Sequence, residues 1–325
     1  KFISLIMLLY AGKASLSSFK YSSSTFILLG IIDTVKKLKR WSPSAGKTFI
    51  LKSGTSKTIR NNTENIKNIS IHVPTHLKPL NDEQFGHYLA GLIDGDGHFS
   101  SQQQLVIVFS SPDIQLAYYI KQVIGYGSVK KVKNKNAYVY IISNKEGIIR
   151  TINLINGKLR TLNKFNQVIN NILENKVYSY LNKNLEFKFN ESNDFYNHWL
   201  AGFSDADASF QIKVVSRDNR PRPEIRLNFQ IDQKNNYVLL LIKELFGGNI
   251  GYRKNQDTYY YGSTSFYSAK KVINYFDNFH LQSSKQNNYL KWRKAYIMVQ
   301  KKHHLTEIGI DKIIKLKKSM NRKSV

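Results

Sequence analysis

From about residue 81 onward, apolar and polar residues alternate with the periods expected of strands and helices. In residues 210–214 and 225–231, apolar side chains take every second position, which predicts two strands with one apolar and one polar face. Residues 237–246 follow a helical spacing and precede two glycines, which predicts a helix that ends there. The same order occurs earlier in the chain, as a predicted strand at 105–110, a helix at 113–124 and a lysine-rich hairpin at 128–142.

Each of these runs follows a near-copy of one short segment. Leu89–Gly97 reads LAGLIDGDG and Leu200–Ala208 reads LAGFSDADA, and an aromatic residue precedes each copy. A repeated segment with matching strands and helices behind it indicates a duplicated domain. We therefore predict an α+β fold of two tandem αββαββα half-domains, at residues 81–181 and 193–325, joined by a polar linker at 182–192.

Residues 1–80 differ from the rest because they show no sustained period. Short apolar bursts alternate with clusters of Ser, Gly and Lys, and we predict a poorly ordered N-terminal extension. The longest apolar runs, at residues 5–10 and 26–32, are much shorter than the roughly 20 residues that cross a bilayer. We therefore expect no membrane partner.

The charge balance points to a polyanionic partner. The chain has 49 Lys and Arg against 22 Asp and Glu, a formal net charge of +27. Nucleic acid is the commonest such partner, since each neutralised phosphate releases condensed counterions. Cysteine is absent, which excludes disulfides and thiolate zinc sites, so any metal must be held by oxygen or imidazole.

Both repeated segments have the features of helices that begin at a capping residue. Asn81 with Gln84 resembles a capping box at the start of the first helix. Ser192 or Asn193, with Asp194, can cap the second helix. The two predicted helices therefore have similar starts.

Small residues lie four positions apart on each predicted helix. Gly91 and Gly95 share a face of the first helix, and Gly202 and Ala206 share the matching face of the second. Small side chains allow two helices to approach closely. We therefore expect the two helices to pack side by side.

Parallel packing would bring Asp96 and Asp207 to the same end of the helix pair. Two facing carboxylates at helix C-termini repel each other and oppose the helix dipoles, unless a cation neutralises them. Oxygen ligands suit Mg²⁺, and a metal with a water molecule can hydrolyse a phosphodiester. The alternative is that each aspartate only caps a helix-to-strand turn, but two copies in so basic a chain favour the metal site.

The two nine-residue segments resemble the signature helices of the LAGLIDADG homing endonucleases and their maturase relatives. The chain is similar to the single-chain, double-motif members that fungal mitochondrial group I introns encode. The resemblance implies two saddle-shaped sheets that straddle DNA about a pseudo-two-fold axis. It also implies that Asp96 and Asp207 bind metal, with the backbone carbonyls of Gly95 and Ala206 as further ligands.

The resemblance further implies a lysine and a polar residue near the hydrolytic water in each half. Lys285 and Gln233 match these positions in the second half. Lys164 and Ser111 are the corresponding residues in the first half. For each lysine, the alternative is an ordinary solvated side chain.

The polar faces of the strands are the expected DNA-reading surfaces. In the second half, the candidate base-contacting side chains are Gln211, Lys213, Arg226, Asn228 and Gln230. The first half has Val106 and Val108 on the strand face that should meet DNA, which predicts uneven base reading. Each half should read about one helical turn, giving a double-stranded target of roughly 20 bp for a monomeric protein.

The sequence therefore predicts a homing endonuclease that makes a Mg²⁺-dependent double-strand break. The alternative is an RNA maturase that assists splicing of a group I intron RNA, with or without nuclease activity. Intact Asp96 and Asp207 favour cleavage, and they argue against a DNA-binding regulator that has only kept the fold. The resemblance also implies an intron-encoded protein of the mitochondrion.

Overall fold

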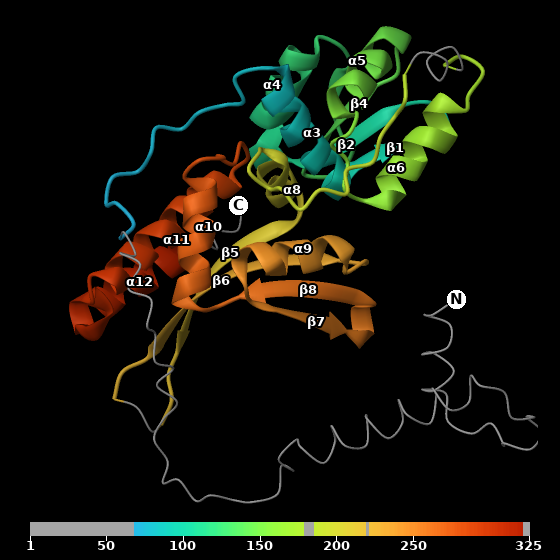
Figure 1. The fold of residues 1–325 in the computed structure, drawn as a ribbon. Helices are drawn as coiled ribbons and strands as arrows, with labels where there is room; N and C mark the ends of the chain where they lie inside the picture. Colours follow the sequence, from blue (N-terminus) through green and yellow to red (C-terminus); the bar gives the residue numbers. More distant parts are fainter. Residues whose placement is uncertain (1–67, 179–184, 219–220, 321–325) are drawn as a thin grey trace, which may run out of the picture. The chain divides into compact units, whose positions relative to one another are not determined.

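The computed structural model describes residues 68–178, 185–218 and 221–320 (Figure 1). Residues 1–67 of the predicted extension and part of the predicted linker lie outside the described residues. The two repeated segments end two helices, α3 (Asp82–Asp96) and α8 (Trp199–Asp207). Each helix passes directly from its last aspartate into a strand.

The first half has four strands and its helices in the predicted order. After α3 follow β1 (Gly97–Phe99), β2 (Leu105–Ser110), α4 (Ile114–Ile124), β3 (Ser128–Lys131), β4 (Ala137–Ile142), α5 (Lys145–Ile155) and α6 (Leu162–Val168). A short π-helical segment, Ile169–Leu173, continues α6. The strands form an antiparallel sheet in the order β1-β2-β4-β3.

The second half repeats this plan. After α8 follow β5 (Ala208–Val215), β6 (Glu224–Gln233), α9 (Tyr237–Phe246), β7 (Asn249–Arg253), β8 (Thr258–Ser263), α10 (Phe266–Phe276), α11 (Lys285–Gln300) and α12 (Glu307–Met320). Its sheet has the order β5-β6-β8-β7, which is the same topology. The α+β fold with two tandem half-domains is therefore confirmed, and α9 has the predicted bounds.

The strand register shows how closely the halves correspond. The residue after each motif acid pairs with an isoleucine, Gly97 with Ile107 and Ala208 with Ile231. Ile107 and Ile231 in turn pair with buried tyrosines of β4 and β8. Each tyrosine hydroxyl donates to a backbone carbonyl near the end of the preceding helix, at 2.7 and 2.8 Å. Equivalent positions in the two sheets can therefore be assigned from the register.

The predicted start of the first motif helix is confirmed, and that of the second is wrong. Asn81 caps α3, since its Oδ1 accepts a hydrogen bond from Gln84 N at 2.9 Å. In contrast, α8 begins only at Trp199, whose N–H donates to Asn197 Oδ1 at 2.9 Å. The carbonyls of Ser192 and Asp194 accept from the buried Arg160 guanidinium. Residues 192–194 lie outside any helix, and α8 begins five residues after Asp194, so Ser192, Asn193 and Asp194 cap no helix.

Residues 69–72 of the predicted extension are fixed against the second half. Gln300 in α11 bonds to both the N–H and the carbonyl of Ile69, each at 3.0 Å. Arg293 donates to the carbonyls of Ser70 and His72 at 3.0 and 3.1 Å. The prediction of poor order is therefore wrong for residues 69–72. The boundary between the extension and the first half-domain, at residue 80, stays a prediction. None of the helices within the described residues is long and apolar enough to cross a bilayer.

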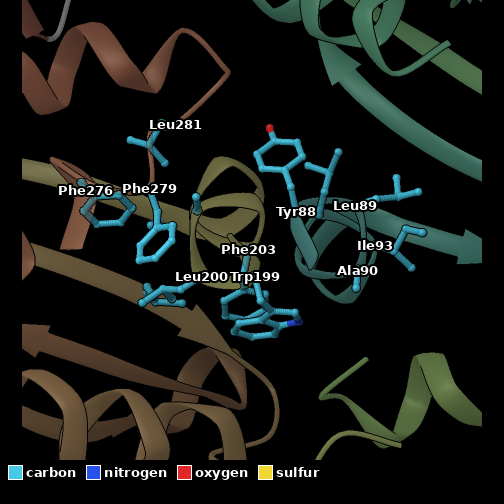
Figure 2. Close-up of a cluster of buried hydrophobic side chains, with 14 of the residues drawn as sticks. Tyr88, Leu89, Ala90, Ile93, Trp199, Leu200, Phe203, Phe276, Phe279 and Leu281 are labelled. Carbon is cyan, nitrogen blue, oxygen red and sulfur yellow. The ribbon is translucent and has the colours of Figure 1, made fainter. Parts of the chain in front are cut away.

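The close contact between α3 and α8 depends on two glycines. A Cβ on Gly91 would overlap the Trp199 carbonyl and lie 2.8 Å from Phe203 N. A Cβ on Gly202 would overlap the Tyr88 carbonyl in the same way. Figure 2 shows the two helices side by side, with Trp199 and Phe203 packed beneath them. The expected close packing of the motif helices is therefore present.

We predict that Gly91→Ala lowers the free energy of unfolding by about 3 kcal/mol or more, because two rigid backbones must separate to admit the methyl group. Urea unfolding followed by circular dichroism measures this change. Gly262→Ala is the matched control, since a Cβ there meets only Asn228 Oδ1, at 3.4 Å. The control should change stability by less than about 1 kcal/mol. Equal losses in both variants would contradict the backbone-contact argument.

Candidate active site

The two predicted metal-binding acids meet at the C-terminal ends of α3 and α8. A Cβ on Gly95 would lie 2.9 Å from Asp207 Oδ2 and would overlap the Ala206 side chain. Gly95 and Ala206 therefore contact each other across the helix pair. Asp96 is the last residue of α3 and Asp207 the last residue of α8, and the two are close enough for the charge of Asp96 to act on Asp207.

The surroundings of both acids disfavour their charged forms. Partial burial and repulsion from Asp96 raise the pKa of Asp207 to about 6. Loss of hydration also raises the pKa of Asp96, although that side chain keeps an exposed surface; the charges of Lys285 and Lys164 oppose the rise, and the charge of Asp113 adds to it. The surroundings therefore oppose ionisation of both acids, and a bound cation would offset this effect.

Both predicted lysines lie beside the acids. Lys285 Nζ donates to the carbonyl of Ala206 at 2.6 Å and to that of Ser204 at 3.2 Å. Lys164 Nζ donates to the carbonyl of Gly97 at 2.6 Å. Burial lowers the pKa of each lysine, while the nearby aspartates oppose that shift. The two ammonium groups therefore approach the acids from the two halves of the chain.

The predicted polar residues of the two halves are placed differently. Gln233, the last residue of β6, donates from Nε2 to Asp207 Oδ2 at 2.6 Å. Ser111 begins a short 3-10 turn, and its N–H donates to the carbonyl of Asn136 at 3.2 Å. Asp113 lies in the same turn, and its negative charge raises the pKa of Asp96. The first half therefore presents a carboxylate near its motif acid, where the second half presents an amide.

Asp113 also joins the two halves. Its Oδ1 accepts a hydrogen bond from the N–H of Ser284, which precedes α11, at 2.6 Å. Its Oδ2 accepts from the Ser110 hydroxyl at 2.6 Å. The sequence analysis missed this residue, since only the fold brings residue 113 next to residue 284.

Two buried acids, Asp94 and Asp205, hold the chain segments that lead into the lysines. Asp94 accepts hydrogen bonds from the N–H of Arg160 at 2.7 Å and from the N–H and hydroxyl of Thr161. Asp205 accepts in the same way from the N–H of Gln282 at 2.7 Å and from the N–H and hydroxyl of Ser283. These segments immediately precede α6 and α11, which carry Lys164 and Lys285. Each buried acid therefore positions one lysine.

The same buried acids bond across the helix pair. Trp199 Nε1 of the second half donates to Asp94 Oδ2 at 2.8 Å. Tyr88 of the first half donates through its hydroxyl to Asp205 Oδ2 at 2.7 Å. Burial raises the pKa of Asp94 to about 6, and its hydrogen bonds oppose the shift. Tyr88 and Trp199 precede the repeated segments, and their recurrence with the two acids was the signal that could have revealed these bonds.

A cavity of about 250 Å³ opens on one side of the acid pair. It lies between the segment that begins α6 and the segment that links β6 to α9. Its lining includes Asp94, Gly95, Arg160, Lys164 and Gln233. The cavity therefore gives a small polar ligand access to the Lys164 and Gln233 side chains.

The available donors fit a divalent metal with oxygen ligands. Within the described residues, no cluster of three or more His, Cys, Asp and Glu could hold a metal by side chains alone. The donor set is two carboxylates and neighbouring backbone carbonyls, which leaves positions for water and phosphate oxygens. Mg²⁺ commonly binds in this way, with one or two carboxylates and substrate phosphates completing its shell.

The candidate DNA-contacting residues of the second half share one face of the second sheet. The register places Gln211 opposite Asn228 and Lys213 opposite Arg226. Asn228 is only 3% exposed, and its amide donates to Gln211 at 3.2 Å and to Gln230 at 3.3 Å. Asn228 therefore positions its two neighbours instead of presenting its own amide.

Three further polar residues on this sheet were missed by the sequence analysis. Asp232 accepts from Gln230 at 3.1 Å and pairs with Arg253 at 3.0 Å. The Arg253 guanidinium lies 4.5 Å from the ring centroid of Tyr260. These contacts extend the polar face across β6, β8 and β7, so the second sheet presents hydrogen-bonding groups over most of its width.

Fold and site together define a class: duplicated α+β nucleases with an acid pair at the junction of two motif helices. A sequence profile described as LAGLIDADG endonuclease matches residues 89–170 and 200–296. The chain belongs to the LAGLIDADG endonuclease family. This membership makes it a DNA endonuclease.

The chain is also similar to individual intron-encoded proteins and to a solved structure. The chain is 59% identical over 318 residues to an uncharacterised cox1 intron-2 protein of Schizosaccharomyces pombe, covering 96% of this chain and 97% of the relative. It is 29% identical to the intron-encoded DNA endonuclease aI3 of Saccharomyces cerevisiae, covering 68% of this chain and 65% of the relative. The crystal structure of the meganuclease I-SmaMI bound to uncleavable DNA is similar in fold, with a TM-score of 0.57 and 22% identity, covering 73% of this chain and 99% of that chain.

The raised pKa of Asp207 predicts a pH-dependent stability in the absence of metal. Between about pH 4 and pH 6, the folded chain keeps a proton that the unfolded chain releases, so the free energy of unfolding falls as the pH rises. The expected contribution of Asp207 is about 1–3 kcal/mol, lost above its folded pKa. Chemical denaturation in the presence of a chelator, at about pH 4.5 and about pH 7, measures the difference in the free energy of unfolding.

Asp207→Asn should be more stable than the wild type at neutral pH without metal, and it should show a weaker pH dependence. Added Ca²⁺ should stabilise the wild type more than this variant. Asp311→Asn, at an exposed position of α12, is the control and should behave as the wild type. A variant that is less stable than the wild type at pH 7 would contradict the repulsion argument.

Proposed function

We propose that this chain is a homing endonuclease that makes a site-specific double-strand break, with Asp96 and Asp207 as its metal-binding residues. The observation that supports this proposal is the meeting of two electrostatically strained carboxylates at the end of the motif helices. In these positions they would hold divalent metal, and we propose Mg²⁺ as the physiological ion. The carbonyls of Gly95 and Ala206 are proposed as additional ligands.

A bound divalent metal would supply Lewis acidity and a water of lowered pKa for attack on the phosphodiester. The protein contributes the groups around that reaction. Lys164 and Lys285 would offset the charge of the phosphate as it gains negative character. Gln233, already bonded to Asp207, would orient the water on the second-half side. On the first-half side we assign no residue to this task, since the contact that supports the assignment in the second half is the bond from Gln233 to Asp207.

DNA binding would use both charge and side-chain hydrogen bonds. The net charge of +27 favours a strong phosphate contribution. Gln211, Lys213 and Gln230 are the side chains of the second sheet proposed to contact base edges, and Arg226, which is paired with Glu224, can exchange that partner for DNA. We propose a target of roughly 20 bp and a monomeric enzyme, because one chain carries both halves.

We further propose that the protein acts in the mitochondrion on the intronless form of its own host gene. This proposal is supported by two relatives whose names describe them as intron proteins, one of them from an intron of cox1. The second candidate function is an RNA maturase that binds a group I intron. The paired acids favour cleavage, since splicing assistance by itself would not require Asp96 and Asp207 to be kept.

The proposal predicts metal-dependent cleavage of a DNA that spans the intron insertion site. Asp96→Asn and Asp207→Asn should each slow cleavage by at least about 100-fold while leaving DNA affinity in Ca²⁺ within a few-fold. Gel analysis of linearised plasmid in Mg²⁺ measures the rate, and Asp311→Asn is the control. A folded wild-type protein that cuts no such DNA, but accelerates splicing of its intron, would establish the maturase instead.

A further inference from the structure

The outer face of the first sheet is aliphatic at its centre, with His98 and Ser128 on the edge strands beside it. Its helices cover the opposite face, where Leu105, Ile107 and Phe109 of β2 are buried and α4 packs. On the outer face, Val106 and Val108 alternate with these buried residues, and the side chain of Val108 is 50% exposed. An aliphatic strand face open to solvent is costly unless a partner covers it.

The cross-strand pairs extend this face over the two central strands. Val106 pairs with Ile141, and Val108 pairs with Val139. Val108 is exposed, and the other three side chains are partly buried. The register makes Val106 the equivalent of Gln230 and Val108 the equivalent of Asp232, because Ile107 corresponds to Ile231. The two sheets therefore present opposite chemistry at equivalent positions: hydrogen-bonding groups in the second and methyl groups in the first.

Charge at the border of the aliphatic face indicates what covers it. The hairpin that joins β3 and β4 carries exposed lysines: Lys130, Lys131, Lys133 and Lys135. Lys130 pairs with Val139 in the sheet, so a cation directly adjoins the aliphatic face. A row of exposed ammonium groups beside it fits a phosphate backbone, and it does not fit an apolar protein surface.

We infer that the first half reads its DNA half-site through the C5-methyl groups of thymine. This inference rests on the proposed function and specifies how one half of the target is recognised. In the major groove, thymine alone among the four bases presents a methyl group, and apolar side chains are suited to contact it. Valine and isoleucine cannot bond to the polar groups of any base pair, and only an A·T pair offers a methyl group in return, so a G·C pair would lose hydration without compensation.

The two half-sites are therefore read by different means. The half-site under the first sheet is thymine-rich, and its discrimination comes from methyl contacts. The half-site under the second sheet is read by hydrogen bonds from side chains such as Gln211 and Gln230. Val106, Val108, Val139 and Ile141 are the specificity-determining residues of the first half.

Uracil substitution tests this inference, since uracil differs from thymine only by the methyl group. The probe is a target recovered by cleavage selection from random duplex DNA, then synthesised with thymine or uracil in one half-site at a time. Binding is measured in Ca²⁺. Each contacted methyl that is removed from the first half-site should weaken binding about fourfold, which corresponds to the transfer free energy of one methyl-sized group. Uracil in the second half-site should change binding by less than about twofold, because that sheet contacts polar edges.

Val108→Thr is the matched protein variant, because threonine keeps the shape and strand preference of valine while replacing one methyl by a hydroxyl. It should reduce the preference for thymine over uracil at one position of the first half-site. Val177→Thr is the control, since Val177 is 53% exposed and lies outside both sheets. The control should keep the full thymine preference.

Two outcomes would overturn the inference. If uracil in the first half-site leaves affinity unchanged while the target is still cut, the methyl contacts are absent and the proposed function stands. If the wild-type protein cuts no duplex in the selection, the proposed function fails and the inference fails with it. Cleavage of the all-thymine target, lost in Asp207→Asn, separates these two cases.

Discussion

The rest of the structure depends on the backbone contact between α3 and α8. Because Gly91 and Gly202 lack side chains, each helix lies directly against a carbonyl of the other. This contact fixes the two half-domains on each other. It also brings the last residues of the two helices, Asp96 and Asp207, close together. The burial of Asp207 and its repulsion from Asp96 are a cost to folding, visible in the raised pKa of Asp207. The helix pair therefore holds two carboxylates together at the expense of stability, which is characteristic of a functional site.

Two buried acids turn this contact into an ordered catalytic centre. Each accepts one hydrogen bond from the opposite half, through Trp199 to Asp94 and through Tyr88 to Asp205. Each also accepts several from the segment that leads into a lysine-bearing helix of its own half. A shift of one motif helix would therefore disturb hydrogen bonds in both halves, so the acids and the lysines are held as one unit.

The sequence predicted most of the fold because periodicity and duplication are local signals. Its errors have long-range causes. The start of α8 was misplaced because the carbonyls of Ser192 and Asp194 bond to Arg160, about thirty residues away, and this segment forms no helix. Asp113 was missed because only the packing of the two halves brings it to Ser284. Asn228 has the alternation of an outward-facing strand residue, yet its neighbours across the sheet bury it.

The two halves have diverged where no contact links them. At the catalytic centre, Trp199 and Tyr88 each donate to the buried acid of the opposite half, so a change of either aromatic residue removes a hydrogen-bond partner from the other half. The outer faces of the two sheets have no comparable bond between them among the hydrogen bonds of the described residues. Val106 and Gln230 can therefore differ without cost to the helix pair. Duplication followed by this uneven constraint yields a reaction centre with paired acids and paired lysines that can serve an asymmetric DNA target.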